Sequence, residues 1–363
     1  MQLMVCGSMF QLYTALTIKQ QFLKDEKVDL VLMNSTPMFK KLATNTELSK
    51  IFNKVFFLPD GSKKGGFNRI VRSKYYRKIF DVFPKHYLNK ITGHRWDKYT
   101  DIYFSSFNII TLRLQAHLYN KNKNLKTHLF EDGVSTYTIR SRYQWAISET
   151  TRKILKIKNF EDRFNDVYLF EPQLMCFDYG FPIIKISGPR EIPGLIEIFD
   201  NVFKDNQNRI EEKFIFFEES FNNDGCESND AELIDILWET LEKKDFILKN
   251  HPRNSKDRFK DVLPTVDFPM LWEHYIFKND IEKKILVTVS SNTIFVPYIL
   301  GGIKPTVILL YKIFNGTNPV FMSGNFEKYL EKYLMYTEEK IYIPETIEEY
   351  KNYILKFKNE CDE

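Results

Sequence analysis

Short apolar runs, each followed directly by polar residues, recur through the first half of the chain. Amphipathic stretches at 11–24 and 108–120 separate some of these runs and predict helices. This alternation is typical of a parallel sheet whose strands are joined by right-handed crossovers. The predicted strands lie at 2–8, 28–35, 54–61, 100–106 and 126–130.

The second half repeats this rhythm after a region rich in Pro and Gly, which places a domain change near residue 190. The chain has 363 residues, more than one hydrophobic core usually serves. We therefore expect a GT-B-like α/β architecture, with two Rossmann-like domains, 1–190 and 191–363, whose parallel sheets face a central cleft. Strands are predicted at 212–220, 245–249, 285–289 and 305–311, with a helix at 231–244.

The composition is that of an ordinary globular protein, with 43% hydrophobic and 28% charged residues. Its four cysteines are widely spaced without a Cys-x-x-Cys pair, which argues against a disulfide framework and a zinc site. The first apolar run is too short for a signal peptide, and no run approaches the roughly 20 residues that a bilayer crossing needs. These features indicate a cytoplasmic protein.

Positive charge is concentrated in one segment, residues 63–98. This segment carries eleven Lys or Arg residues against two acids, a net +9, whereas the whole chain is only +4. Aromatic residues are interspersed with the basic ones, a combination that suits contact with an acidic membrane surface. Nucleic-acid binding is not expected, because the segment matches no known binding module.

Polar residues follow the predicted strands 245–249 and 285–289, which we interpret as neighbours in one sheet. His251 follows the first strand, and a histidine with a pKa of about 6.5 can donate a proton near neutral pH. Ser290, Ser291 and Asn292 open an apolar helical stretch after the second, where free N–H groups and the helix dipole favour an anion. The pattern indicates a phosphate held beside a histidine. A turn histidine and an ordinary helix N-cap are the alternatives.

Two aspartates are candidates for a general base. Asp132 lies in Glu131-Asp132-Gly133 after a predicted strand, and Asp224 lies in a similar Asn-Asp-Gly loop. Asp-Gly is also a common turn dipeptide, so each can be structural. The neighbouring carboxylate of Glu131 favours Asp132, since adjacent carboxylates repel and can raise a pKa.

Several common nucleotide-binding signatures do not occur in the sequence. It has no Gly-x-Gly-x-x-Gly after a strand, no P-loop and no Asp-x-Asp. A glycosyltransferase with this sequence is therefore expected to need no metal, with side chains and backbone dipoles stabilising the leaving phosphate. Glu273, between the two polar strand ends, can accept hydrogen bonds from ribose hydroxyls or can lie on a solvated helix face.

Glu-Asp-Gly at 131–133, Lys-Asn-His-Pro at 249–252 and Ser-Ser at 290–291 occur in an order that resembles bacterial sialyltransferases. The length and block order look most like glycosyltransferase family 52, which includes lipooligosaccharide and capsule sialyltransferases. The resemblance implies CMP-sialic acid as donor and inverting transfer to a galactose hydroxyl of a surface glycan, with no cofactor. It also suggests a homodimer attached peripherally to the inner face of the bacterial inner membrane.

By the same resemblance His251 is the acid that assists departure of CMP, and Ser290 and Ser291 hold its phosphate. Lys249 and Glu273 lie near cytosine and ribose. Asp132 is the preferred base, with Asp224 as the alternative. The full set of predicted binding residues is Gly7, Glu131, Lys249, Pro252, Arg253, Glu273, Ser290, Ser291 and Asn292.

Two other functions fit the same sequence. One is a GT-B transferase that uses another nucleotide sugar, such as a UDP-hexose. The other is a noncatalytic module that binds anionic surface glycans through the basic segment 63–98. The acceptor and its linkage, 2,3 or 2,6 or 2,8, stay open, because no motif here encodes the acceptor pocket.

Overall fold

The computed structural model divides the chain into two compact units, Met1–Val202 and Phe203–Glu363, called here the first and the second unit. Each is organised around one sheet, and the strand pairs within both sheets are parallel. The structure describes residues 1–33, 38–58, 96, 98–105, 109–140, 163–203, 209–221, 226–251, 254, 258–259, 262–266, 271–316, 324–338 and 340–360.

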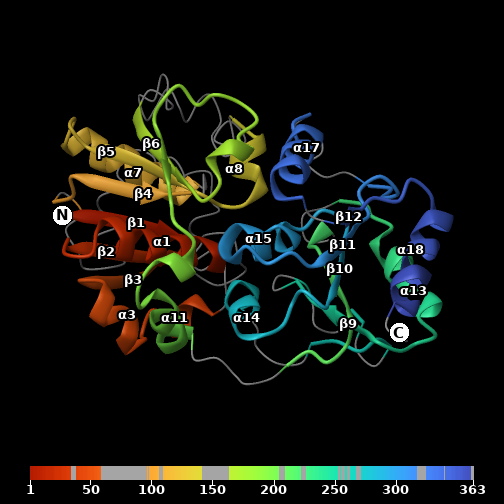
Figure 1. Cartoon of the computed structure of the whole chain (residues 1–363). Coiled ribbons are helices and arrows are strands. Elements are labelled where there is room, and N and C mark those ends of the chain that lie inside the picture. Colours follow the sequence, from red (N-terminus) through yellow and green to blue (C-terminus); the bar gives the residue numbers. More distant parts are fainter. Residues whose placement is uncertain are drawn as a thin grey trace, which may run out of the picture. The chain divides into compact units, whose positions relative to one another are not determined.

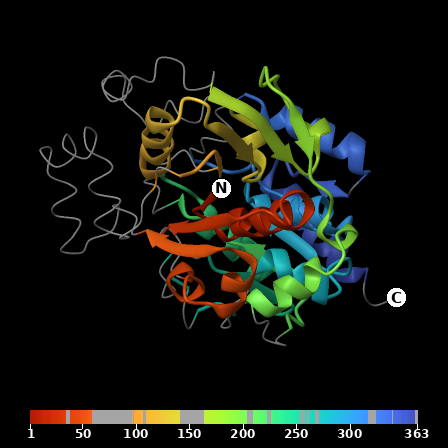
Figure 2. The same ribbon diagram turned by 90° about the vertical axis from the view of Figure 1, so that its left-hand side faces the viewer.

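The first unit contains a seven-stranded sheet in the order β3-β2-β1-β4-β5-β6-β7 (Figures 1 and 2). Strand β1 lies next to β2 on one side and β4 on the other, in register with both. The strands are β1 (Gln2–Cys6), β2 (Val28–Met33), β3 (Lys54–Leu58), β4 (Asp101–Phe104), β5 (Lys126–Phe130), β6 (Phe164–Leu169) and β7 (Ile183–Lys185).

Strands β1 and β2 are made almost entirely of apolar residues and are buried along most of their length. Continuous burial of this kind is expected for inner strands of a parallel sheet covered on both faces. Asp29 is the exception in β2, and its carboxylate accepts hydrogen bonds from Tyr99 Oη and Asn53 Nδ2, each at 2.6 Å. The buried carboxyl group therefore has the hydrogen-bond partners that burial demands.

The helices of the first unit include α11, which follows the Pro- and Gly-rich region. Phe199 of α11 stacks on Tyr13 with ring centroids 3.7 Å apart, and Val202 O accepts from Asn45 Nδ2 at 2.8 Å. The division between the units therefore lies at the end of α11, whereas the sequence places it near residue 190. The helices are α1 (Met9–Phe22), α2 (Phe39–Leu42), α3 (Thr46–Ile51), α7 (Ile109–Lys121), α8 (Val134–Thr138) and α11 (Leu195–Phe203).

The second unit contains a five-stranded sheet in the order β12-β11-β10-β8-β9. Strand β8 pairs with β10 on one side and with β9 on the other. The expectation that the strands now labelled β9 and β10 are neighbours is therefore wrong. The strands are β8 (Phe214–Phe217), β9 (Phe246–Lys249), β10 (Ile285–Thr288), β11 (Thr306–Leu309) and β12 (Ile341–Tyr342).

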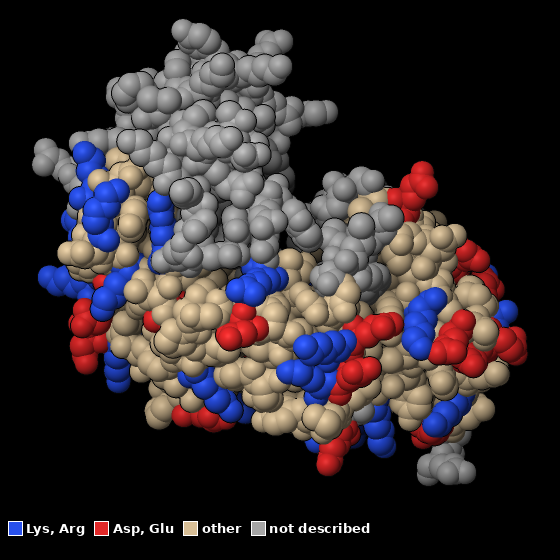
Figure 3. All heavy atoms as spheres, turned by 90° about the horizontal axis from the view of Figure 1, so that it is seen from above, with Lys and Arg blue, Asp and Glu red and all other residues tan. Residues whose placement is uncertain are grey.

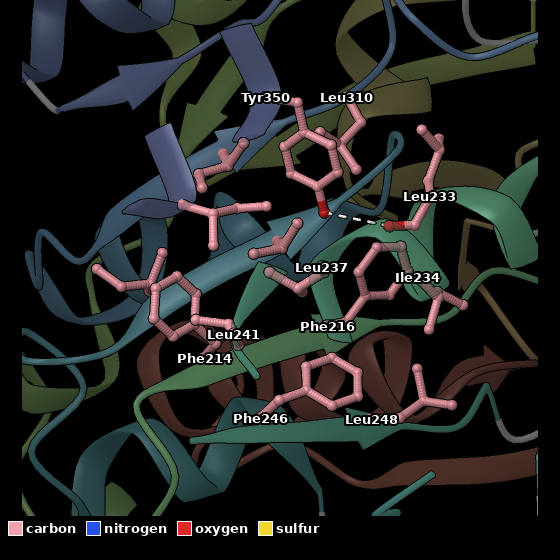
Figure 4. Close-up of a cluster of buried hydrophobic side chains, with 14 of the residues drawn as sticks. Phe214, Phe216, Leu233, Ile234, Leu237, Leu241, Phe246, Leu248, Leu310 and Tyr350 are labelled. Carbon is pink, nitrogen blue, oxygen red and sulfur yellow. Dashed lines mark hydrogen bonds between the residues drawn. The ribbon is translucent and has the colours of Figure 1, made fainter. Parts of the chain in front are cut away.

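A cluster of buried apolar side chains joins helices α13 and α18 to the sheet of the second unit (Figure 4). Leu233 and Leu237 of α13 meet Phe214 and Phe216 of β8, and Tyr350 of α18 donates to Leu233 O at 3.4 Å. Each such side chain contributes about 1.5–3 kcal/mol by leaving water. The helices are α13 (Asp230–Thr240), α14 (Trp272–Lys278), α15 (Val296–Gly301), α17 (Phe326–Thr337) and α18 (Ile347–Asn359).

On the described surface shown in Figure 3, side chains of both charge signs lie close together. Trp96 and Lys98 are the only residues of the basic segment 63–98 that the structure describes. No helix among the described residues is both long and apolar enough to cross a membrane. Cys6, Cys176 and Cys226 take part in no disulfide bond, and Cys361 lies outside the described residues.

Candidate functional site

The carboxyl ends of β1 and β5 carry the candidate residues of the first unit. Ser8 accepts from Gln11 N at 3.2 Å as the N-cap of α1, and its hydroxyl donates to Asp132 Oδ1 at 3.4 Å. The N–H of Gly7 donates to Gln11 Oε1 at 2.6 Å. The structure thus brings together Gly7 and Asp132, through the turn that starts α1, as expected for strand ends in a parallel sheet.

The turn after β5 separates the two acids of the Glu-Asp-Gly motif. Gly133 has φ +73°, a conformation that favours glycine, and it begins the short helix α8. Asp132 N donates to Thr136 Oγ1 at 2.8 Å, which fixes the backbone of this acid. Asp132 remains partly exposed, whereas Glu131 is fully buried. Successive side chains point to opposite sides of an extended chain, so only one of the pair reaches the surface.

Glu131 is buried, and no cationic side chain among the described residues pairs with it. Its Oε2 accepts from Tyr137 Oη at 2.5 Å and from Phe170 N at 2.9 Å. Its Oε1 has no hydrogen-bond partner among the described residues. Burial raises the pKa of Glu131 to about 7, although the two hydrogen bonds oppose the shift.

The carboxyl end of β8 carries a second pair of acids, Glu218 and Glu219, which the sequence reasoning did not select. Glu218 is buried, and its Oε2 accepts from His251 N at 3.0 Å while its Oε1 accepts from Arg258 at 3.2 Å. Arg258 also forms a two-point ion pair with Asp230, at 2.7 and 2.9 Å. The backbone of His251 is therefore tied to a buried ionic network.

Asp230, at the start of α13, completes this network. Burial acts to raise the pKa of Asp230, but hydrogen bonds from Arg258 and Ser228 outweigh it and lower the pKa below its ordinary value. The hydrogen bonds that Arg258 donates to Asp230 raise the pKa of Arg258. Both groups are therefore charged near neutral pH, and each offsets the cost of burying the other.

Glu219 contacts the start of the Ser-Ser segment. Ser290 donates to its carboxylate twice, from N and from Oγ, each at 2.5 Å, and Thr288 Oγ1 lies 3.3 Å from it. Ser290 is buried, while Glu219 keeps part of its surface exposed. Burial of the carboxyl raises the pKa of Glu219 to about 7, against the lowering effect of these hydrogen bonds.

Ser291 forms the N-cap of a 3-10 helix, η4 (Asn292–Ile294), which precedes α15. Its Oγ accepts from Thr293 Oγ1 at 2.9 Å and from Thr293 N at 3.4 Å. Because η4 and α15 are short, they supply little of the helix dipole that the sequence reasoning assigned to this position. Any anion held here depends on the Ser290 and Ser291 groups themselves.

Lys249 and Glu273 come within electrostatic reach of each other, from the end of β9 and the first turn of α14. Burial lowers the pKa of Lys249, and burial raises the pKa of Glu273. The charge of each residue opposes the shift of the other. The two side chains predicted to lie near a nucleoside therefore occupy one low-dielectric region.

The placement of β8 changes how the predicted residues are connected. His251 after β9 and Ser290 after β10 belong to strands that flank β8, and each is hydrogen-bonded to one acid of the Glu218-Glu219 pair. Strand order depends on contacts distant in sequence, so it could not be obtained from the local pattern. An acidic pair directly after the apolar run 214–217 is the signal that could have found Glu218 and Glu219, since it repeats the Glu131-Asp132 pattern.

Three predicted residues lie outside the described residues, namely Asp224, Pro252 and Arg253. The described part of the chain contains no group of three or more His, Cys, Asp or Glu side chains arranged to hold a metal ion.

Solved structures similar to this one cover 99% of the chain and have the GT-B fold, as the sequence predicted. The glycosyltransferase of kitacinnamycin has a TM-score of 0.53 and 10% identity, with 91% of its chain covered. Arabidopsis thaliana UGT89C1 complexed with UDP-L-rhamnose has a TM-score of 0.53 and 12% identity, with 90% covered. Methanocaldococcus jannaschii UDP-GlcNAc 2-epimerase, at TM-score 0.51, 12% identity and 93% covered, shows that this fold also serves other chemistry.

The model of the alpha-2,8-polysialyltransferase family (POLYST) matches residues 2–311, a span that includes every predicted site residue. The chain therefore belongs to the alpha-2,8-polysialyltransferase family, and it is a glycosyltransferase. The resemblance to sialyltransferases is confirmed at this level, while the likeness to glycosyltransferase family 52 stays a prediction. No curated protein sequence matches the chain significantly.

Proposed function

We propose that the protein is a metal-independent, inverting sialyltransferase that transfers sialic acid from CMP-sialic acid to a galactose-terminated surface glycan of lipooligosaccharide or capsule type. One observation carries the proposal. In a member of a sialyltransferase family, His251 and Ser290 are both tied to one acidic pair at the carboxyl edge of a parallel sheet. Ligands of open α/β sheets bind outside such edges.

His251 is the proposed general acid. The departing CMP develops negative charge on its phosphate, and an imidazolium near neutral pH can hydrogen-bond to that phosphate or protonate it. The backbone of His251 is held by Glu218, which in turn is held by Arg258. This support limits the movement of the histidine during the reaction.

The proposed donor contacts use the other residues of the second unit. Ser290 and Ser291 contribute hydroxyl and N–H groups to the phosphate, in place of a metal ion. Glu273 accepts hydrogen bonds from ribose hydroxyls, and Lys249 lies beside cytosine. The low dielectric around Lys249 and Glu273 strengthens both contacts.

Asp132 is the proposed general base that deprotonates the acceptor hydroxyl. It is partly exposed at a strand end, whereas Glu131 is enclosed and bonded to Tyr137. The C2 centre of the sialyl group develops oxocarbenium character, so bond breaking runs ahead of bond making. The acceptor oxygen attacks the face opposite to CMP, which inverts the configuration. Asp224 is the alternative base.

The family match favours a second acceptor. Its name describes α-2,8 polysialyl transfer, which corresponds to an acceptor that already ends in sialic acid. The same donor site and the same base serve either acceptor, because both present a hydroxyl to the C2 centre. The proposal also includes a homodimer. It further includes peripheral attachment of the protein to the inner face of the inner membrane through residues 63–98.

The test is to incubate the purified protein with CMP-sialic acid and three acceptor conditions: lactoside, sialyllactoside and none. We expect CMP release that depends on acceptor, a product of inverted configuration, and the same rate with and without a chelator. Preference for lactoside supports the first acceptor, and preference for sialyllactoside supports the second. A melting temperature raised by UDP but not by CMP favours the UDP-sugar alternative and contradicts the proposal.

A further inference from the structure

Glu219 occupies the groups that the proposed function assigns to the phosphate. Ser290 donates both its N–H and its Oγ–H to the Glu219 carboxylate, each over 2.5 Å. A carboxylate and a phosphate are both anions that accept hydrogen bonds, so they compete for the same two donors. Glu219 also keeps part of its surface exposed, which allows an incoming ligand to meet it.

We propose that Glu219 is an internal competitor of the donor phosphate, and that the nucleotide binds when the Glu219 carboxyl is neutral. This inference rests on the proposed function, because it takes Ser290 as a phosphate ligand. A neutral carboxyl removes the repulsion between two anions at close range. It also gains an O–H that can donate to a phosphate oxygen.

The surroundings of Glu219 support a proton on this group near neutral pH. Burial raises its pKa to about 7, and the negative charge of Asp230 on α13 adds to the shift. Hydrogen bonds from Ser290 and Thr288 on the β10 side act in the opposite direction. The adjacent Glu218 is paired with Arg258.

The expected size of the effect follows from this titration. With a pKa of about 7, Glu219 is about nine-tenths neutral at pH 6 and about one-tenth neutral at pH 8. When only one state binds, the apparent dissociation constant rises in inverse proportion to the fraction of that state. Glu219 alone therefore weakens binding by about tenfold between pH 6 and pH 8.

The experiment measures the affinity of CMP for the full chain by calorimetry at pH 6 and pH 8. The phosphate of CMP also titrates in this range, so the comparison is between proteins at one pH. Glu219→Gln mimics the neutral carboxyl and is expected to bind CMP about tenfold more tightly than the wild type at pH 8, but within twofold of it at pH 6. Glu232→Gln, which removes an exposed acid of α13, is expected to match the wild type at both pH values.

Equal or weaker CMP binding by Glu219→Gln at pH 8 overturns the inference. A wild type that binds no CMP at either pH overturns the proposed function instead, so the two failures are distinguishable. If Glu219→Gln does not fold, the wild type alone provides the readout. At pH 8 it is expected to take up close to one proton per CMP bound, measured in two buffers of different ionisation enthalpy, and no uptake contradicts the inference.

Discussion

Two acidic pairs follow strands in the two units, Glu131-Asp132 after β5 and Glu218-Glu219 after β8. In each pair the first acid is fully buried and the second keeps some exposure. The difference lies in what the buried acid contacts. Glu218 is bonded to Arg258, whereas the partners of Glu131 in the described part of the chain are the Tyr137 hydroxyl and the Phe170 N–H.

This difference determines where a proton is held. A buried carboxyl needs either a cation or a proton, because an unpaired charge is costly away from water. In the first unit burial raises the pKa of the enclosed Glu131, away from the exposed acid. In the second unit burial raises the pKa of Glu219, which contacts Ser290. The second unit thus places a titratable proton within its proposed site.

The largest expected effect distinguishes the roles of Asp132 and Glu131 in the first unit. Asp132→Asn removes the proposed base, so we expect turnover to fall by about 10²- to 10⁴-fold with the melting temperature unchanged. Glu131→Gln is the matched control, expected to retain turnover within about tenfold. Steady-state rates of CMP release measure both. The opposite order, with Glu131→Gln inactive and Asp132→Asn active, would show that the roles of the two acids are exchanged.

The next largest effect concerns Arg258, the cation that pairs with the buried acids Glu218 and Asp230. Arg258→Met leaves the buried carboxylates of Glu218 and Asp230 without their partner, and we expect a loss of about 3–5 kcal/mol in the free energy of unfolding. Urea denaturation measures it. Lys243→Met, which breaks an exposed ion pair with Glu239, is the control and should cost less than about 1 kcal/mol. Equal losses in both variants would contradict the buried network.

A third prediction concerns the pH dependence of stability in the first unit. Folding raises the pKa of Glu131 from 4.5 to about 7, so the folded state holds more protons between these values. Stability is therefore lost as pH rises from about 4.5 to about 7, by about 3 kcal/mol for this one group. Glu131→Gln has no ionisable group at this position and therefore lacks this pH-dependent loss of stability. Denaturant titrations should give the wild type and Glu131→Gln similar free energies of unfolding in acid. At pH 8 the variant should be the more stable of the two. Parallel pH profiles of the two proteins would refute this.

The smallest effect comes from an ionic cluster of the first unit. His128 lies 2.6 Å from Asp166 and 3.2 Å from Asp101, across strands β4, β5 and β6. Burial acts to lower the pKa of His128, but hydrogen bonds to both aspartates raise it overall. The stabilisation by protonated His128 is therefore fully present below the pKa of this histidine in the unfolded chain. It is lost as pH rises through the pKa of His128 in the folded protein.

We expect His128→Gln to cost about 1–2 kcal/mol at pH 6 and less at pH 9, because charged hydrogen bonds are lost in the first case only. Thermal denaturation at both pH values measures this. Tyr103 stacks on the ring with centroids 4.2 Å apart, so a loss independent of pH would assign the role of His128 to packing instead.

The strands and the fold class could be predicted because each inner strand is a continuous apolar run ended by polar residues. The sequence could also locate His251 and Ser290 at strand ends for the same reason. Three strands were missed. β6 and β7 lie in or beside the region rich in Pro and Gly whose composition indicates a domain change, and β12 is only two residues long.

The organisation of the second site could not be predicted, because it depends on contacts between distant segments. β8 enters the sheet between β9 and β10, and this places Glu218 and Glu219 between the histidine and the serines. Arg258 lies in a polar stretch with no periodicity, so nothing local distinguishes it from a solvated arginine. Only the folded chain shows that it pairs with Glu218.

The most direct test of the central claim is the turnover of His251→Ala with CMP-sialic acid and its preferred acceptor. The alanine keeps the backbone N–H that donates to Glu218, so the fold and the melting temperature should be retained. We expect turnover to fall by about a hundredfold or more, given what general acids usually contribute. A folded variant that turns over at the wild-type rate would contradict the assignment of this edge of the sheet as the site of sialyl transfer.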